Sequence, residues 1–95
     1  NKIFIMSLER YYMERETEKK KSKINSIIKF EFVESIKSKK IDQNNPDLVL
    51  ELFAIDIFKK NLNYEIVMLF SNKKIMILNV EVLEISMDDE IKIND

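Results

Sequence analysis

The chain contains no cysteine, histidine, glycine or tryptophan, and these absences exclude several kinds of chemistry. Without glycine there can be no intact P-loop or dinucleotide-binding fingerprint, because those backbones must approach phosphates closely. Without histidine and cysteine, the common nucleophile–base pairs and the usual zinc sites are missing as well. Disulfide bonds cannot form, which favours a cytoplasmic location.

The sequence also lacks long apolar runs and a large excess of positive or negative charge. The sequence has no run of about 18 apolar residues, the length that a helix needs to span a bilayer. Its start also lacks the charged and apolar regions of a secretory signal. We therefore expect no membrane partner. The formal net charge of −1 provides no overall attraction to nucleic acid or anionic lipid. With 45% hydrophobic and 35% charged residues, the composition is typical of a globular protein.

A length of 95 residues fits one domain. We expect a single β domain over residues 1–90 and a C-terminal tail over residues 91–95. The first residue is Asn1 rather than Met, and strand-like sequence begins almost at once. We therefore expect the domain to lack an N-terminal portion, and a chain without that portion to self-associate through an uncovered sheet edge.

What the sequence does contain is repeated alternation of apolar and polar residues, the pattern of half-buried strands. The alternation is clearest where Ile28, Phe30 and Phe32 share one face. For Leu48–Phe58 a buried helix is an alternative, although its β-branched residues favour a strand. Five strands are predicted, over Ile3–Met13, Ile24–Ile36, Leu48–Phe58, Tyr64–Phe70 and Ile75–Met87.

Short connections join these strands, so the sequence predicts a mainly β fold with little helix. The expected architecture is an antiparallel up-and-down meander of about five strands that forms a curved sheet or partial barrel. Helix is limited to a turn or two around Glu14–Lys23 or Val33–Lys40. The connections near residues 14–23 and 59–63 are expected at one end, and those near residues 39–47 and 71–74 at the other.

Three local features refine this prediction. A turn is expected over residues 42–47, where Pro46 presets its own φ angle. Asn72 is the expected left-handed residue of a tight hairpin, because asparagine tolerates that region when glycine is unavailable. The apolar phase of the last strand switches after Val82, which predicts a β-bulge or strong bend. The predicted core contains Phe30, Phe32, Leu50, Leu52, Met68, Phe70, Leu78 and Val80.

Four segments carry a family resemblance: Leu8-Glu-Arg10-Tyr11 with Met13-Glu14, Phe30-x-x-Val33-x-x-Ile36-x-Ser38-x-x-Ile41-Asp42, Pro46-Asp47-x-Val49-Leu50-x-Leu52-x-Ala54-Ile55, and Leu78-x-Val80-Glu81-x-Leu83-Glu84. In this order they resemble a bacterial, chiefly alphaproteobacterial, family known as domain of unknown function 2948. The resemblance implies an additional N-terminal stretch, and it implies no catalytic residues because none are established for the family. Lys40 stands where the family usually has glycine, and residues 71–74 replace a glycine-rich turn.

Carboxylates inside the predicted strands are the remaining candidates for catalysis. Two inward carboxylates with separated pKa values could act as acid and base, and the candidates are Glu51, Asp56, Glu81 and Glu84. The interpretation that we favour is that all four face solvent. The acidic run at residues 88–90 is expected in a solvated tail, because it lacks the spaced ligands and the glycine of a calcium-binding loop.

Lysines and one arginine are the candidate partner-binding residues. Lysines neutralise phosphates, and Tyr11 and Tyr12 nearby could stack on bases. Arg10 is one of only two arginines, and its planar fork predicts an ion pair with Glu81 or Glu84 on another strand. The possible partner-binding residues are Arg10 and six lysines expected at one end of the meander: Lys19, Lys20, Lys21, Lys23, Lys59 and Lys60.

These observations favour a small cytoplasmic, non-enzymatic binding or scaffold module with an unidentified protein partner. Two alternatives stay open: an RNA- or ribosome-associated protein that uses the lysine-rich loop end, and an enzyme that works with carboxylates alone. No cofactor and no metal are expected, because the residue types that usually hold them are missing.

Overall fold

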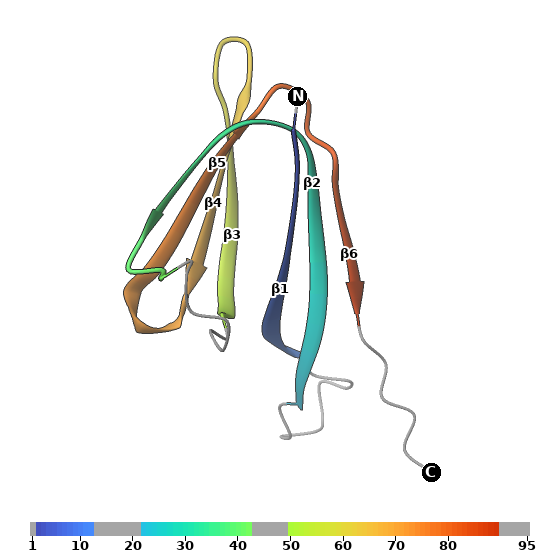
Figure 1. Ribbon diagram of the computed structural model, residues 1–95, viewed down its shortest axis with the longest axis vertical. Coiled ribbons are helices and arrows are strands. Elements are labelled where there is room, and N and C mark those ends of the chain that lie inside the picture. The colour runs from blue at the N-terminus through green and yellow to red at the C-terminus, as the bar shows by residue number, and fades with distance from the viewer. Residues whose placement is uncertain (1, 13–21, 43–49, 90–95) are drawn as a thin grey trace.

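A computed structural model describes residues 2–12, 22–42 and 50–89, and most of these described residues are in strands (Figure 1). The mainly β class is therefore confirmed, and the described part of the segment Leu48–Phe58 forms a strand from Glu51 onward rather than the alternative helix. The elements are β1 (Lys2–Tyr12), β2 (Ser22–Lys39), β3 (Glu51–Lys59), β4 (Tyr64–Phe70), the short 3-10 turn η1 (Ser71–Lys73), β5 (Lys74–Val80) and β6 (Ile85–Asp89).

The strands form one six-stranded sheet that closes on itself. Their order is β1-β3-β4-β5-β2-β6, and an additional pairing of β1 with β2 closes the first five into a barrel. The predicted partial barrel is confirmed, but the strand order differs from a simple meander. Strand β2 returns to lie beside β5, and β1 pairs with β3 in parallel at Glu9–Glu51 and Arg10–Leu52.

The length and bend of β2 explain this difference. Its first half pairs with β6 from Ser26 to Phe30, and its second half pairs with β5 from Val33 onward. Figure 1 shows β2 rising beside β1 and β6, crossing over the top and descending beside β5. The bend falls at Phe32, which has a φ angle of 57°. One long strand thus belongs to both sides of the barrel.

Opposite this bend, the chain between β5 and β6 leaves the ladder. Val80 pairs with Val33 and Ile85 pairs with Phe30, so the four residues of 81–84 face only two residues of β2. Two backbone hydrogen bonds hold this corner: the Glu31 N–H donates to the Glu84 carbonyl at 3.1 Å, and the Glu81 N–H donates to the Phe32 carbonyl at 3.0 Å. The switch in apolar phase thus marks a real interruption, but the single strand predicted over Ile75–Met87, with a β-bulge or strong bend, is wrong because the chain forms two strands, β5 and β6.

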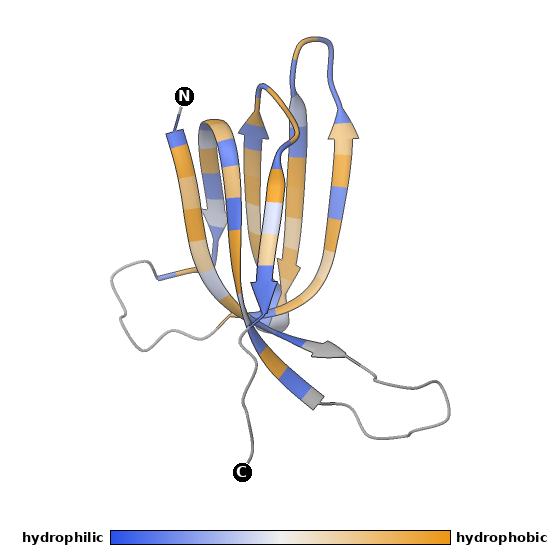
Figure 2. Ribbon diagram, turned by 90° about the vertical axis from the view of Figure 1, so that its right-hand side faces the viewer, coloured by the Kyte–Doolittle hydropathy of each residue, from blue (hydrophilic) through white to orange (hydrophobic). Residues whose placement is uncertain are grey.

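The core lies inside the barrel, where the inward side chains of the strands meet. Figure 2 shows the apolar and polar bands that alternate along the strands. Six predicted core residues are buried and Leu52 packs against them half-buried. The prediction that Phe32 lies in the core is wrong. Its side chain is only half-buried, because β2 bends at this residue and Val33 takes the inward position. The buried apolar set is Leu8, Ile28, Phe30, Val33, Leu50, Ile66, Met68, Phe70, Met76, Leu78 and Val80.

Besides Phe32 at the bend of β2, the positive φ angles of this glycine-free chain fall on asparagine and lysine within the described residues. Asn72 has φ 61° and ψ 34°, as the hairpin prediction required. Lys73 and Lys40 also have positive φ angles, of 59° and 62°. Glycine would adopt these left-handed φ angles without a Cβ clash, so the turns place less suitable residues there.

Several predictions concern the ends of elements. No turn of helix forms at Val33–Lys40, where at most a turn or two was expected, because β2 continues as strand to Lys39. Asp88 and Asp89 belong to β6 rather than to a solvated tail. Three segments with predictions lie wholly or mostly outside the described residues: the polar segment at residues 14–23, the turn at residues 42–47 and the tail at residues 91–95.

Candidate functional site

One edge of β3 is open over most of its length. On one side β3 pairs with β4 from Leu52 to Lys59. On the other side it meets β1 only at its first two residues, beside a hydrogen bond of 2.7 Å from the Glu9 N–H to the Leu50 carbonyl. Within the described residues, no strand therefore pairs with this second edge from residue 53 to residue 59.

Exposed apolar side chains line this open edge. Phe53 is 65% exposed, Ile57 45% and Phe58 49%, and Leu62 in the connection to β4 is 94% exposed. Natural edge strands are usually shielded by charges, proline or a bulge, and here a bulge at Phe53, the exposed Asp56 and Lys59 at the end of the strand provide the shielding. We call these four residues the β3 edge patch.

The structure separates the lysines that the sequence predicted to lie together. The Lys23 ammonium lies 3.9 Å from carboxylate oxygens of both Glu9 and Glu51, at the start of β3. Lys59 ends β3 and Lys60 follows it, about 26 Å away along eight residue steps. Figure 1 shows the β3–β4 connection at the top and the start of β2 at the bottom. Lys19, Lys20 and Lys21 lie outside the described residues.

Arg10 forms the predicted structural ion pair, but with a different carboxylate. Its Nη2 lies 2.5 Å from Oδ2 of Asp89, not beside Glu81 or Glu84. Its Nε donates to the Ser26 hydroxyl at 3.3 Å, and Ser26 donates to Oδ1 of Asp89 at 2.5 Å. The Ser26 and Arg10 hydrogen bonds hold the pKa of Asp89 below its usual range. The sequence missed this partner because Asp89 was assigned to the tail.

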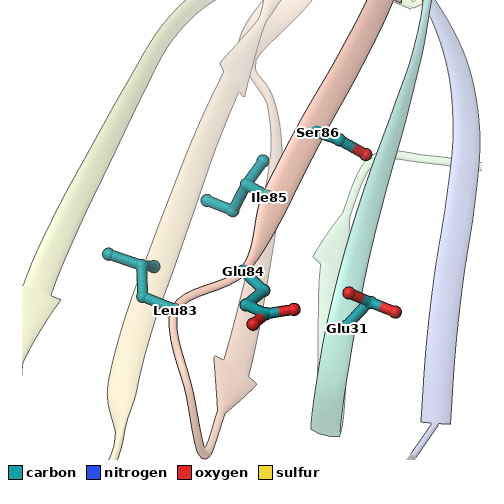
Figure 3. Close-up of a pocket in the computed structure, with 5 residues that line it drawn as sticks. All are labelled: Glu31, Leu83, Glu84, Ile85 and Ser86. Carbon is teal, nitrogen blue, oxygen red and sulfur yellow. The ribbon is translucent and has the colours of Figure 1, made fainter.

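A pair of carboxylates marks the corner between β5 and β6. Glu31 and Glu84 point toward each other across an open depression of about 350 Å³, lined also by Leu83, Ile85 and Ser86 (Figure 3). A hydrogen bond that protonated Glu84 donates to Glu31 and the repulsion between the two carboxylates raise the pKa of Glu84. The Lys29 ammonium lies 3.6 Å from Glu31 and opposes this shift.

This pair is the only part of the carboxylate hypothesis that the geometry supports. Of the four candidates, only Glu84 lines the depression, and Glu31 was not among them. Glu51 instead lies near Lys23, and Asp56 is exposed on β3. Glu84 is exposed to solvent, so water can screen its charge and compete for its proton.

The structure also brings together four lysines that the sequence did not single out. Lys39 pairs with Ile75, so the end of β2 lies beside Lys74 and the β4–β5 turn. Lys40 follows Lys39, and Lys73 precedes Lys74. We call Lys39, Lys40, Lys73 and Lys74 the basic end. The available signal was two Lys-Lys pairs flanking connections that were predicted at the same end.

Two searches of the described ranges concern other kinds of site. No group of three or more Asp or Glu residues there is arranged to hold a metal ion. The same part of the chain contains no helix that is long and apolar enough to cross a membrane.

Comparison with known proteins identifies the family. A family model described as "Protein of unknown function (DUF2948)" matches residues 1–93. The chain therefore belongs to the DUF2948 family, as its four sequence segments indicated. Searches among curated proteins and among solved structures found no match.

Proposed function

We propose that this member of the DUF2948 family is a non-enzymatic protein-binding module that receives an extended segment of a partner on the open edge of β3. The observation that carries the proposal is the coincidence of an unpaired strand edge with the β3 edge patch. Either feature alone is common on protein surfaces. Together they provide both hydrogen-bonding groups and apolar contacts for one added strand.

The backbone of β3 supplies the directional part of this recognition. An edge strand presents a row of N–H and C=O groups, and an extended peptide can pair with them in register. Such pairing depends little on the sequence of the partner. It would extend the sheet that already runs from β3 through β4 and β5 to β2.

The β3 edge patch supplies apolar contacts on both faces of the added strand. Phe58 pairs with Glu65 on the outer face, while Ile57 pairs with the buried Ile66 on the inner face. With roughly 200 Å² per phenylalanine, Phe53 and Phe58 alone expose about 230 Å². The whole patch thus approaches the few hundred Å² at which an apolar surface usually marks an interaction site.

A capture experiment with paired variants tests this proposal. The chain is immobilised and exposed to native lysate, with and without nuclease, as the parent, as Phe58→Lys and as Ile27→Lys. Ile27 is the matched control, because it is 52% exposed but lies on a strand that is paired on both sides. Each variant therefore places a charge on an exposed apolar position, and only one of the two lies on an open edge.

We expect a partner that survives nuclease, is retained by Ile27→Lys and is lost with Phe58→Lys. Hydrogen exchange should then show that the captured partner protects the amides of residues 53–59. Equal loss with both variants, or protection at another strand, would overturn the assignment to β3. The absence of any nuclease-resistant partner would overturn the protein-binding function itself.

A further inference from the structure

The basic end concentrates positive charge where two distant parts of the chain meet. The pairing of Lys39 with Ile75 places Lys39 and Lys74 one residue apart on strands about 4.8 Å from each other, with their side chains on opposite faces of the sheet. Lys40 and Lys73 continue the same edge on either side. Figure 1 shows the end of β2 and the β4–β5 turn close together at the lower left.

No counter-charge balances these lysines within the described chain. None of the four takes part in an ion pair or hydrogen bond between described side chains, whereas Lys23 and Lys29 each have carboxylate partners. Asp42 is the acidic residue nearest in sequence to Lys40, and it already has an interaction of its own. The basic end is thus a local positive surface on a chain of net charge −1.

Backbone strain falls on the same residues. Lys40 and Lys73 both have left-handed φ angles, which L-residues with a Cβ avoid. Glycine or asparagine would relieve the strain at either position. Strained conformations often persist where a side chain is needed for binding. Two strained lysines at the basic end, for which the described residues provide no ion-pair partner, therefore point to a ligand that requires their charge.

We propose that the basic end binds the phosphate backbone of single-stranded RNA. Lysine ammoniums act as point charges on flexible stems, so they suit the repeated phosphates of a flexible chain better than a single shaped anion. No large apolar side chain within residues 39–42 or 70–75 is exposed, so this surface lacks the apolar groups with which basic surfaces enter membranes. It also offers no aromatic face for stacking, so binding should not depend on RNA sequence.

Salt dependence gives the first measurement. The full chain is titrated into a fluorescein-labelled 20-nucleotide uridine oligomer, and anisotropy reports binding between 50 and 200 mM salt. Four neutralised phosphates, at about 0.7 per contact for single strands, predict a roughly 50-fold loss of affinity over this range. No binding at 50 mM, or affinity that is independent of salt, would overturn the proposal.

Two double charge reversals locate the site. Lys39→Glu with Lys74→Glu changes the net charge by the same amount as Lys59→Glu with Lys60→Glu, at the end of β3. We expect the first pair to weaken RNA binding by more than tenfold and the control pair by less than threefold. Equal losses would show that only net charge matters. Tighter binding to phosphatidylserine vesicles than to RNA would show that the ligand is a membrane surface.

A third variant separates binding from folding. Lys40→Gly with Lys73→Gly removes two charges and relieves two left-handed residues at once. Its midpoint of thermal unfolding should rise while its affinity for RNA falls by several-fold. A variant that is more stable and binds RNA as well as the parent would overturn the assignment. The RNA measurement does not use the β3 edge patch, so its outcome is independent of the proposed protein partner.

Discussion

Strands β3 and β4 are neighbours with similar apolar content, yet they have different fates. β4 lies between β3 and β5, and its side chains alternate cleanly between half-buried and buried. β3 has β4 on one side and an open edge on the other, and most of its second half is exposed. The difference shows that burial depends on neighbours on both sides of a strand as well as on its own sequence.

The same contrast divides the molecule into a closed and an open region. In the closed region, β4 and β5 place Met68 opposite Met76 and Ile66 opposite Leu78, and all four are buried. In the open region, β3 and β6 each have one strand neighbour over most of their length, among the described residues. Stability should therefore concentrate in the first region, and binding surfaces in the second.

The largest expected effect compares a phenylalanine from each kind of environment. Phe30→Ala should lower the free energy of unfolding by about 3–5 kcal/mol, because Phe30 is fully buried and its removal leaves a cavity. Phe53→Ala, on the open edge of β3, should cost less than about 1 kcal/mol. Urea titration of both variants measures the two losses. Similar losses would mean that the open edge is covered in solution.

A smaller effect is expected where β6 is tied to the barrel. The Ser26 hydroxyl is buried and links Arg10 of β1 to Asp89 of β6. Ser26→Ala should cost about 1 kcal/mol, because two hydrogen bonds are lost and their partners stay partly exposed to water. Hydrogen exchange should rise first in residues 85–89. Uniform exchange across all strands would show that β6 unfolds only with the whole barrel.

The same contact should depend on pH. The pKa of Asp89 is lowered in the folded chain, first by the Ser26 hydrogen bond and then by Arg10. Its contribution to stability is therefore present above the unfolded pKa of about 3.9 and is lost as the pH falls through the folded value. Thermal midpoints measured from pH 7 to pH 2 should fall further for the parent than for Asp89→Asn. Parallel curves would contradict this contribution.

Sequence reasoning succeeded where a pattern is local. The period of two predicted the strands, and the phase switch after Val82 predicted the corner between β5 and β6. It failed where pairing decides the outcome. Nothing local shows that β2 bends at Phe32 to join both sides of the barrel, and that bend set the true strand order and exchanged Phe32 for Val33 in the core.

The candidate surfaces follow the same rule. The apolar residues of β3 are evident in the sequence, but their exposure depends on β1 meeting only the first two residues of that strand. Lys23 and Lys59 were expected together on the assumption of a meander, and the actual topology places them at opposite ends of β3. The partner of Arg10 was missed because residue 89 carried no alternation that could mark it as strand.

Turn strain in the closed region provides a prediction of opposite sign. Lys73→Gly should raise the free energy of unfolding by about 0.5–1 kcal/mol, because glycine adopts the φ of 59° without a Cβ clash. Lys37→Gly is the matched control within strand β2, where glycine should lower stability by about 0.5–1 kcal/mol. Urea titration of the two variants tests the sign, and destabilisation by both would contradict the left-handed turn.

The smallest effect is expected at the corner that joins the two regions. The pKa of Glu84 is raised by the hydrogen bond that its protonated form donates to Glu31 and by repulsion between the two carboxylates. A raised acid pKa gives stability that is present below the unfolded value of about 4.3 and is lost as the pH rises through the folded value. The parent should therefore lose stability relative to Glu84→Gln as the pH rises from about 4.

Thermal midpoints at several pH values measure this change, and Glu31→Gln should remove the same dependence because it removes the other half of the pair. Glu65→Gln on β4 changes the charge equally without touching the pair, so it should keep the pH dependence of the parent. The effect should be small because Glu84 is exposed, and added salt should reduce it further. A pH dependence that survives in both Glu84→Gln and Glu31→Gln would show that the two carboxylates do not interact across the corner.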